Sequence, residues 1–225
     1  MTVLRRALAV PIGALAIMAT AAPAGAATVQ TDACVRYVAG QPTMTIIGTG
    51  FSPNGFVSLS TITKAKPTPA VFSSSSALAN GGFLKTTTPP AFSSVNRNLE
   101  TFALVASDTT NPAAPIIATA PFQVVRFGLT TSPTPRRPTS RVTYTARGFT
   151  TGKPVYVHFR FRGVTRRTVN LGVAKGPCGI VSQRMRALPT KALYGTWTSY
   201  TNQSRGSVRQ KPYWQDSFTI FRRFG

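Results

Sequence analysis

The chain is poor in acidic residues and histidine. Its 225 residues include four Asp or Glu and one His. General acid–base catalysis needs two titratable side chains brought together, whereas Asp32, Glu100, Asp108 and Asp216 are scattered and share no motif. His158 lies in an expected strand, and we predict that it is a surface residue. The sequence therefore favours a protein that is not an enzyme.

Motifs for metals and phosphates are also lacking. No Cys/His spacing suits zinc, and no cluster of carboxylates suits calcium. A phosphate-binding glycine loop is followed by a helix. No helix is expected after the glycines Gly48, Gly50, Gly81 and Gly82, so we interpret them as turn residues. We expect no metal, no cofactor and no small-molecule substrate.

A long apolar run occurs at the start of the chain. Arg5 and Arg6 precede apolar and small residues over positions 7–19, and small residues at 24–26 form a cleavage site. The run is too short to cross a hydrocarbon core of ~30 Å. The sequence predicts a signal peptide over residues 1–26 and a secreted mature chain without a transmembrane segment.

Positive charge is abundant and unevenly placed. Residues 27–125 hold five basic and three acidic residues, which leaves a net charge of +2. Residues 126–225 hold fifteen Arg and four Lys against Asp216 alone, a net charge of +18. Such asymmetry indicates an anionic partner for the basic half. We expect an anionic polymer or a cell-envelope surface: a cell-wall polyanion, an acidic polysaccharide or nucleic acid.

Two cysteines, Cys34 and Cys178, lie 144 residues apart and in different halves of the chain. They are not the bridge that joins the two sheets of one antibody-type domain. They pair between domains, pair between chains, or stay free, and the spacing does not choose among these alternatives.

A weak internal repeat suggests the architecture. Residues 44–59 align without a gap to residues 142–157 at an offset of 98, which is about the length of one immunoglobulin-like domain. The same offset places Gly81 on Gly179. The identical pairs are Thr45/Thr143, Gly50/Gly148, Phe51/Phe149 and Val57/Val155.

Strand periodicity and turn residues predict an all-β fold. Apolar residues alternate with polar ones along several short runs, and no part of the mature chain has a 3.6-residue period. We predict two tandem immunoglobulin-like β-sandwich domains, over residues 27–126 and 127–225. Phe51 and Phe149 should occupy equivalent buried positions, and Trp197 should lie in the core. The proline-rich residues 130–139 read as a stiff linker or a domain entry, and residues 64–76 as a surface loop.

The segment from Gly48 to Leu59 has the pattern G-x-G-F-x-P-x-G-x-V-x-L. It resembles the opening hairpin of bacterial secreted immunoglobulin-like modules. The resemblance implies a β-sandwich and an extracellular location, and it brings no catalytic residues. The second copy departs from the pattern at Ala146 and Thr151.

A basic surface is the candidate binding site. In residues 155–162, alternate apolar side chains should face the core, so the intervening ones should face outward together. If the strand with Arg184 and Arg186 lies in the same sheet, both strands form one basic face that a polyanion would bind. The alternative is a structural or adhesive protein whose arginine content is compositional. The predicted binding residues are Tyr156, His158, Arg160, Arg162, Arg166 and Arg167 (the last two in the connecting region), Arg184 and Arg186.

Overall fold

The computed structural model describes residues 26–37, 43–135, 137–188 and 190–221. The predicted signal peptide thus lies, apart from Ala26, outside the described residues. Every regular element in these ranges is a β-strand, and they include no helix long and apolar enough to cross a membrane. The strands are β1 (Thr28–Thr31), β2 (Cys34–Tyr37), β3 (Met44–Thr49), β4 (Phe56–Ile62), β5 (Ala70–Ser76), β6 (Phe83–Thr87), β7 (Leu99–Asp108), β8 (Ile116–Arg126), β9 (Gly128–Ser132), β10 (Arg141–Arg147), β11 (Pro154–Phe161), β12 (Val164–Val173), β13 (Val181–Arg186), β14 (Gly195–Asn202) and β15 (Trp214–Ile220).

Strands β1 to β8 make up the N-terminal half. A three-stranded sheet, β1-β3-β6, packs on a five-stranded sheet in the order β2-β8-β7-β4-β5. Neighbouring strands are antiparallel except for β2, which runs parallel to β8. Alternate side chains of the strands point inward and form one apolar cluster that includes Ile46, Leu59, Leu104 and Phe122.

Strands β9 to β15 make up the C-terminal half, which repeats this arrangement. A three-stranded sheet, β9-β10-β13, packs on a four-stranded sheet in the order β12-β11-β14-β15. A second apolar cluster fills the space between these sheets, and Trp197 lies within it at 0% exposure. The prediction that Trp197 is a core residue is confirmed.

The two halves share one strand order. In the three-stranded sheets, β9, β10 and β13 take the places of β1, β3 and β6. In the larger sheets, β12, β11, β14 and β15 take the places of β5, β4, β7 and β8, in that order. β2 alone has no counterpart among the described residues. The repeat seen in the sequence is therefore a repeat of topology.

A glycine turn recurs at the same place in each half. Phe51 N–H donates to the Gly81 carbonyl at 3.0 Å, and Phe149 N–H donates to the Gly179 carbonyl at 3.2 Å. Both glycines have positive φ, and a Cβ at either would collide with the carbonyl oxygen of the phenylalanine. Phe51 and Phe149 are 3% and 2% exposed, so the prediction of equivalent buried positions is confirmed.

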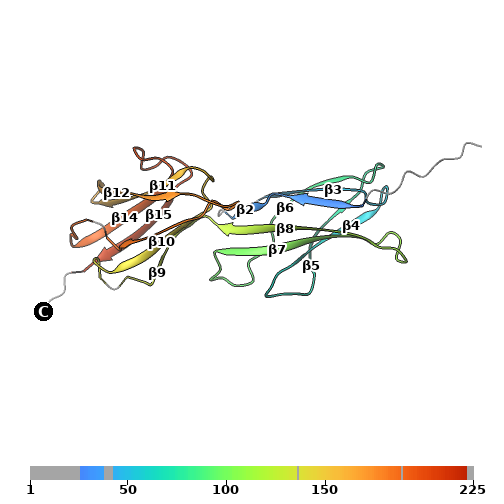
Figure 1. Ribbon diagram of the computed structural model, residues 1–225, viewed down its shortest axis with the longest axis horizontal. Coiled ribbons are helices and arrows are strands. Elements are labelled where there is room, and N and C mark those ends of the chain that lie inside the picture. Colours follow the sequence, from blue (N-terminus) through green and yellow to red (C-terminus); the bar gives the residue numbers. More distant parts are fainter. Residues whose placement is uncertain (1–25, 38–42, 136, 189, 222–225) are drawn as a thin grey trace, which may run out of the picture.

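The halves meet end to end at Phe127, between β8 and β9 (Figure 1). The Phe127 ring packs on Phe149 with centroids 4.9 Å apart, and its N–H donates to the Tyr37 carbonyl at 3.3 Å. A disulfide joins Cys34 to Cys178 across this junction, with Cα atoms 5.2 Å apart. Of the alternatives left open by the sequence, pairing within one chain between the two halves is the observed one.

Two segments differ from expectation. β9 occupies the first part of the segment predicted as a stiff linker or domain entry, where it opens the C-terminal half, and β5 occupies part of the predicted loop at residues 64–76. Each is an edge strand held by a neighbour, β10 or β4, so pairing overrides a weak local signal. The linker prediction holds only beyond Ser132, where Pro133 and Pro135 lack the N–H groups that a strand needs.

Candidate functional site

β11 shows the predicted alternation but not the predicted exposure. Val155, Val157 and Phe159 are buried in the core, and the intervening side chains lie on the outer face of the four-stranded sheet. Around His158 and Tyr200 that outer face is not open, however, since the loop at residues 203–213 between β14 and β15 folds back over it. Tyr156 and Arg160 are half-buried there.

His158 is 1% exposed, so the prediction of a surface histidine is wrong. Its Nε2 faces two acceptors, Asn202 Oδ1 at 3.2 Å and the Ser204 carbonyl at 3.0 Å, which places the ring proton on Nε2. Nδ1 then accepts from the Thr168 hydroxyl at 2.9 Å. The Asn202 amide donates to the Ser207 and Val208 carbonyls at 2.7 and 2.9 Å. This network attaches the covering loop to the sheet, and it engages both ring nitrogens.

An aromatic cluster continues beneath the same loop. The guanidinium carbons of Arg160 and Arg209 lie 5.7 and 5.8 Å from the Tyr200 ring centroid, within cation–π range. Tyr213 packs on Tyr200 with centroids 5.7 Å apart, and Tyr200 is 4% exposed. Arg160 also donates to the Gly163 carbonyl. Its charge is thus engaged within the protein.

The predicted residues do not all lie on the sheet that carries Arg160. Arg184 and Arg186 belong to β13 of the three-stranded sheet, so the assumption that the two arginine-bearing strands share a sheet is wrong. Arg162 follows β11 in a two-residue turn with Gly163, where both have positive φ. Arg166 and Arg167 lie within β12 and not in a connection. The alternation rule was sound, but sheet membership and the turn position were not visible in the sequence.

The structure instead assembles an arginine face on the outer side of the three-stranded sheet. In β10, Val142, Tyr144 and Ala146 point into the core, so Arg141 and Arg147 point outward. Arg141 lies directly opposite Arg186, and Thr143 lies opposite Arg184. We define the arginine face as Arg141, Arg147, Arg184 and Arg186 with Thr130, Ser132, Thr143, Thr145 and Ser182 between them.

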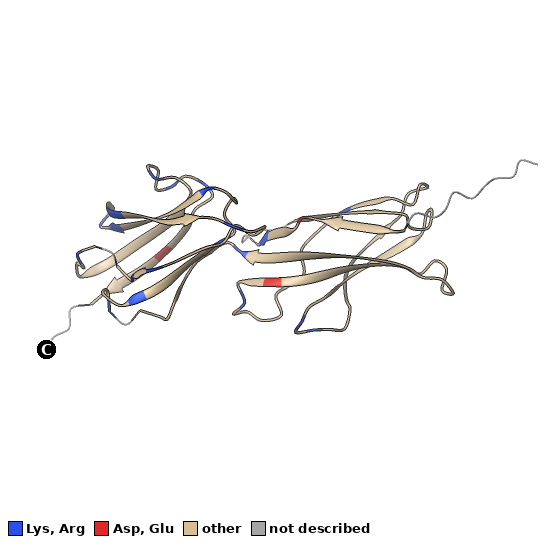
Figure 2. Ribbon diagram, viewed as in Figure 1, with Lys and Arg blue, Asp and Glu red and all other residues tan. Residues whose placement is uncertain are grey.

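The arginine face carries positive charge without a compensating acid. Asp216, the one acid among residues 126–225, lies on β15 of the other sheet. Arg141, Arg184 and Arg186 are exposed, and like charges directly opposite on a sheet repel. Figure 2 shows basic residues gathered in the half that contains β9–β15. Arg141 and Arg147 were not predicted as binding residues from the sequence, although they alternate along the strand with its apolar residues just as Thr143 and Thr145 do.

Two acidic residues of the N-terminal half, Asp108 and Glu100, support the fold. Asp108 accepts from Ser52 N–H at 2.8 Å and from Thr110 N–H at 2.9 Å. Burial raises the pKa of Asp108, but hydrogen bonds from Thr110 and Ser52 outweigh it and lower the pKa to about 2. Glu100 likewise accepts from Ser93 N–H at 2.7 Å. Within the described ranges, no group of three or more His, Cys, Asp or Glu could hold a metal ion.

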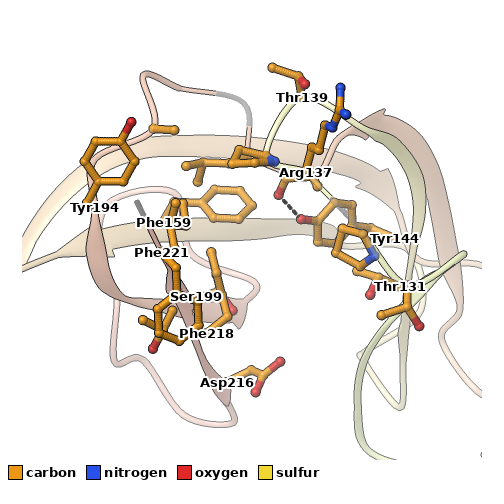
Figure 3. Close-up of a pocket in the computed structure, with 18 of the residues that line it drawn as sticks. Thr131, Arg137, Thr139, Tyr144, Phe159, Tyr194, Ser199, Asp216, Phe218 and Phe221 are labelled. Atoms are coloured by element: carbon orange, nitrogen blue, oxygen red, sulfur yellow. Dashed lines mark hydrogen bonds between the residues drawn. The ribbon is translucent and has the colours of Figure 1, made fainter. Parts of the chain in front are cut away.

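A cavity of about 930 Å³ opens in the C-terminal half between the edge strands β9 and β15 (Figure 3). Its walls are mostly apolar and include Leu129, Phe159, Leu188 and Phe218. The Tyr144 hydroxyl donates to the Ala187 carbonyl at its wall, and burial, with Asp216 nearby, raises the pKa of Tyr144 to about 12. Nothing in the local sequence pattern predicted this cavity.

No protein-family model matches the chain, and no curated protein matches it significantly.

Three solved structures resemble it distantly. A tetra-tandem repeat from the extending region of a large adhesion protein is 17% identical, with 85% of this chain and 47% of that one covered and a TM-score of 0.29. Salmonella alpha-2-macroglobulin (mutant Y1175G) is 11% identical, with 87% of this chain and 16% of that one covered and a TM-score of 0.38. Red sea bream transglutaminase is 12% identical, with 87% of this chain and 31% of that one covered and a TM-score of 0.28. The chain thus spans less than half the length of each. At these TM-scores none carries an argument about fold or function.

Proposed function

We propose that this protein is a secreted, non-catalytic binding module and that its C-terminal half binds an anionic polymer through the arginine face. The observation that carries the proposal is the cross-strand pair Arg141/Arg186 beside Arg184, on a sheet face without an acidic neighbour. Such an arrangement costs folding free energy, and an anionic chain laid across it would recover that cost. Guanidinium groups bond phosphate or carboxylate bidentately, and the surrounding hydroxyls add neutral donors.

The architecture in this proposal is two immunoglobulin-like domains, over residues 27–126 and 127–225. The shared strand order and the recurring Phe–Gly turn support it. Secretion is supported by the Cys34–Cys178 disulfide, since such bonds persist in oxidising compartments. The absence of catalysis is supported by the hydrogen bonds of His158, whose two ring nitrogens both have partners within the protein. It is also supported by Asp108, whose carboxylate accepts a hydrogen bond from Ser52 N–H.

The test compares two triple variants of equal charge on a heparin column and on duplex DNA. Arg141→Ser, Arg184→Ser and Arg186→Ser remove the exposed charges of the arginine face. The control, Arg162→Ser, Arg166→Ser and Arg167→Ser, removes three exposed charges from the β11–β12 hairpin. We expect the first variant to elute at lower salt than the control. On DNA, the log of its affinity should fall less steeply with the log of the salt concentration, the slope becoming less negative by roughly 0.9 for each phosphate contact removed.

Stability provides a second readout of the same variants. Because Arg141 and Arg186 face each other across the ladder, their removal should leave the unfolding midpoint unchanged or raise it. Equal salt shifts for the two triple variants would show that total charge, and not this face, governs retention, and the proposal would fail.

A structural or adhesive role is the second candidate. Exposed basic residues also lie on the β11–β12 hairpin and in the loop at residues 203–213, where Arg205, Arg209 and Lys211 are exposed. This wide distribution, together with the disulfide that joins the halves, suits a cross-linked spacer whose arginine content is compositional. Equal retention of both triple variants and the parent would favour this role.

A further inference from the structure

The cavity between β9 and β15 lies where the N-terminal half has an additional strand. In that half the chain leaves β1, changes sheets and adds β2 beside β8, with Val35 opposite Val124 and 3% exposed. Ala33 carbonyl accepts from Gln123 N–H at 3.0 Å, which extends the pairing. The strand that corresponds to β8 is β15, and among the described residues β15 pairs with β14 alone.

The sequence explains why the C-terminal half does not complete itself in the same way. The chain leaving β9 passes through Pro133, Pro135 and Pro138. Proline has no N–H to donate, so a segment with three prolines is a poor partner for a strand ladder along β15. Thr134, Pro135 and Arg137 of this segment line the cavity instead.

An unpaired edge and an apolar hollow therefore adjoin each other. An edge strand presents a row of free N–H and C=O groups, which is a template for another strand. Aromatic side chains at the cavity are unusually accessible: Tyr194 is 60% and Phe221 is 80% exposed. The inward side chains Phe218 and Ile220 of β15 line the hollow, whereas in the N-terminal half Val124 of β8 has Val35 of β2 beside it.

We propose that this groove binds an extended segment of a partner protein, which adds to the four-stranded sheet as a strand parallel to β15. Its alternate apolar side chains enter the cavity, in the way that Val35 enters the N-terminal core. Acidic residues flank the segment, because the half that receives it carries a net charge of +18 and Arg137 lines the cavity, where Asp216 is the one acidic lining residue. This is the mode of recognition called β-strand addition, in which the backbone supplies affinity and the pockets supply specificity.

A strand fits these features better than a small apolar molecule does. The volume of about 930 Å³ lies within the range that small ligands occupy, roughly 300–1,000 Å³. A lipid or similar molecule, however, would leave the edge of β15 unpaired, whereas a strand satisfies the edge and the hollow together.

The test uses the disulfide-bonded mature protein and a synthetic peptide of alternating threonine and valine with aspartate at both ends. Hydrogen exchange should show new protection in β15 (Trp214–Ile220) and none in β12 (Val164–Val173), the opposite edge of the sheet. Thr131→Trp fills the groove from the inner side of β9, and we expect its dissociation constant to rise at least about tenfold. Thr196→Trp, on the exposed outer face of β14, is the matched control and should bind as the parent does.

A second peptide keeps the test decisive if Thr131→Trp fails to fold. Replacing two valines with proline removes backbone donors and should abolish binding to the parent, while lysine in place of aspartate should weaken it. The proposal is overturned if the first peptide leaves β15 exchange unchanged, or if the proline peptide binds equally well. It is also overturned if the protein dimerises through β15 without peptide, which would make a second copy the occupant. Tighter binding of a fatty-acid probe, with no effect of either peptide, would likewise overturn it.

Discussion

We expect Gly179→Ala to destabilise the C-terminal half much more than the same change at Gly176. Both glycines have positive φ, +53° and +69°, so both alanines carry the left-handed backbone penalty of about 1–2 kcal/mol. A Cβ at Gly176 meets nothing within 4 Å. A Cβ at Gly179 would collide with the Phe149 carbonyl oxygen, so the phenylalanine must move.

The additional cost at Gly179 follows from what that movement breaks. The hydrogen bonds Phe149 N–H to Gly179 O, at 3.2 Å, and Gly148 N–H to Cys178 O, at 2.9 Å, contribute about 1 kcal/mol each. Phe149 is 2% exposed, so its packing in the core is disturbed as well. Gly179→Ala should therefore cost at least about 2 kcal/mol more than Gly176→Ala.

Thermal unfolding followed by circular dichroism measures this difference. For a unit of about 100 residues, 2 kcal/mol corresponds to a midpoint lower by roughly 8–16 °C. Gly81→Ala, whose Cβ would collide with the Phe51 carbonyl oxygen, should lower the stability of the N-terminal half in the same way. Equal midpoints for Gly176→Ala and Gly179→Ala would refute the steric reasoning.

Three further predictions concern other parts of the chain. Folding lowers the pKa of Asp108 from 3.8 to about 2, so the ionised carboxylate stabilises the protein fully above pH 4, and this contribution is lost as the pH falls to 2. Denaturant titrations should therefore show that the difference in unfolding free energy between the parent and Asp108→Ala shrinks by about 2 kcal/mol from pH 4 to pH 2. An unchanged gap would contradict this assignment. Reduction of the Cys34–Cys178 bond, which closes a loop of 144 residues, should lower stability by up to about 5 kcal/mol in the chain-entropy account, and a double Cys→Ser variant should not respond to reductant. Two free thiols in the denatured, unreduced protein would show that the bond is absent. Mass spectrometry of secreted protein should find Ala27 at the N-terminus, and an intact Met1 on a membrane-bound product would count against the signal peptide.

The sequence indicated much of the fold because its signals are local or periodic. Alternation of polar and apolar residues marked β10 and β11, and the offset of 98 residues aligned Phe51 with Phe149. Both signals depend on side chains near one another in the chain. β5 was missed because a serine-rich run has no such pattern, and pairing with β4 is what orders it.

The binding surface depended on information that is not local. The alternation rule identified which side chains leave the core on β11, but it does not say which strands share a sheet or what covers the exposed face. Arg184 lies in the other sheet, and the loop at residues 203–213 buries His158 and Tyr200. By itself, the sequence determined the all-β character of the chain, the repeat and the charge of the basic half. Tertiary structure alone decided the disulfide, the grouping of Arg141 with Arg186 and the open edge of β15, because each depends on residues distant in the chain that only strand pairing brings together.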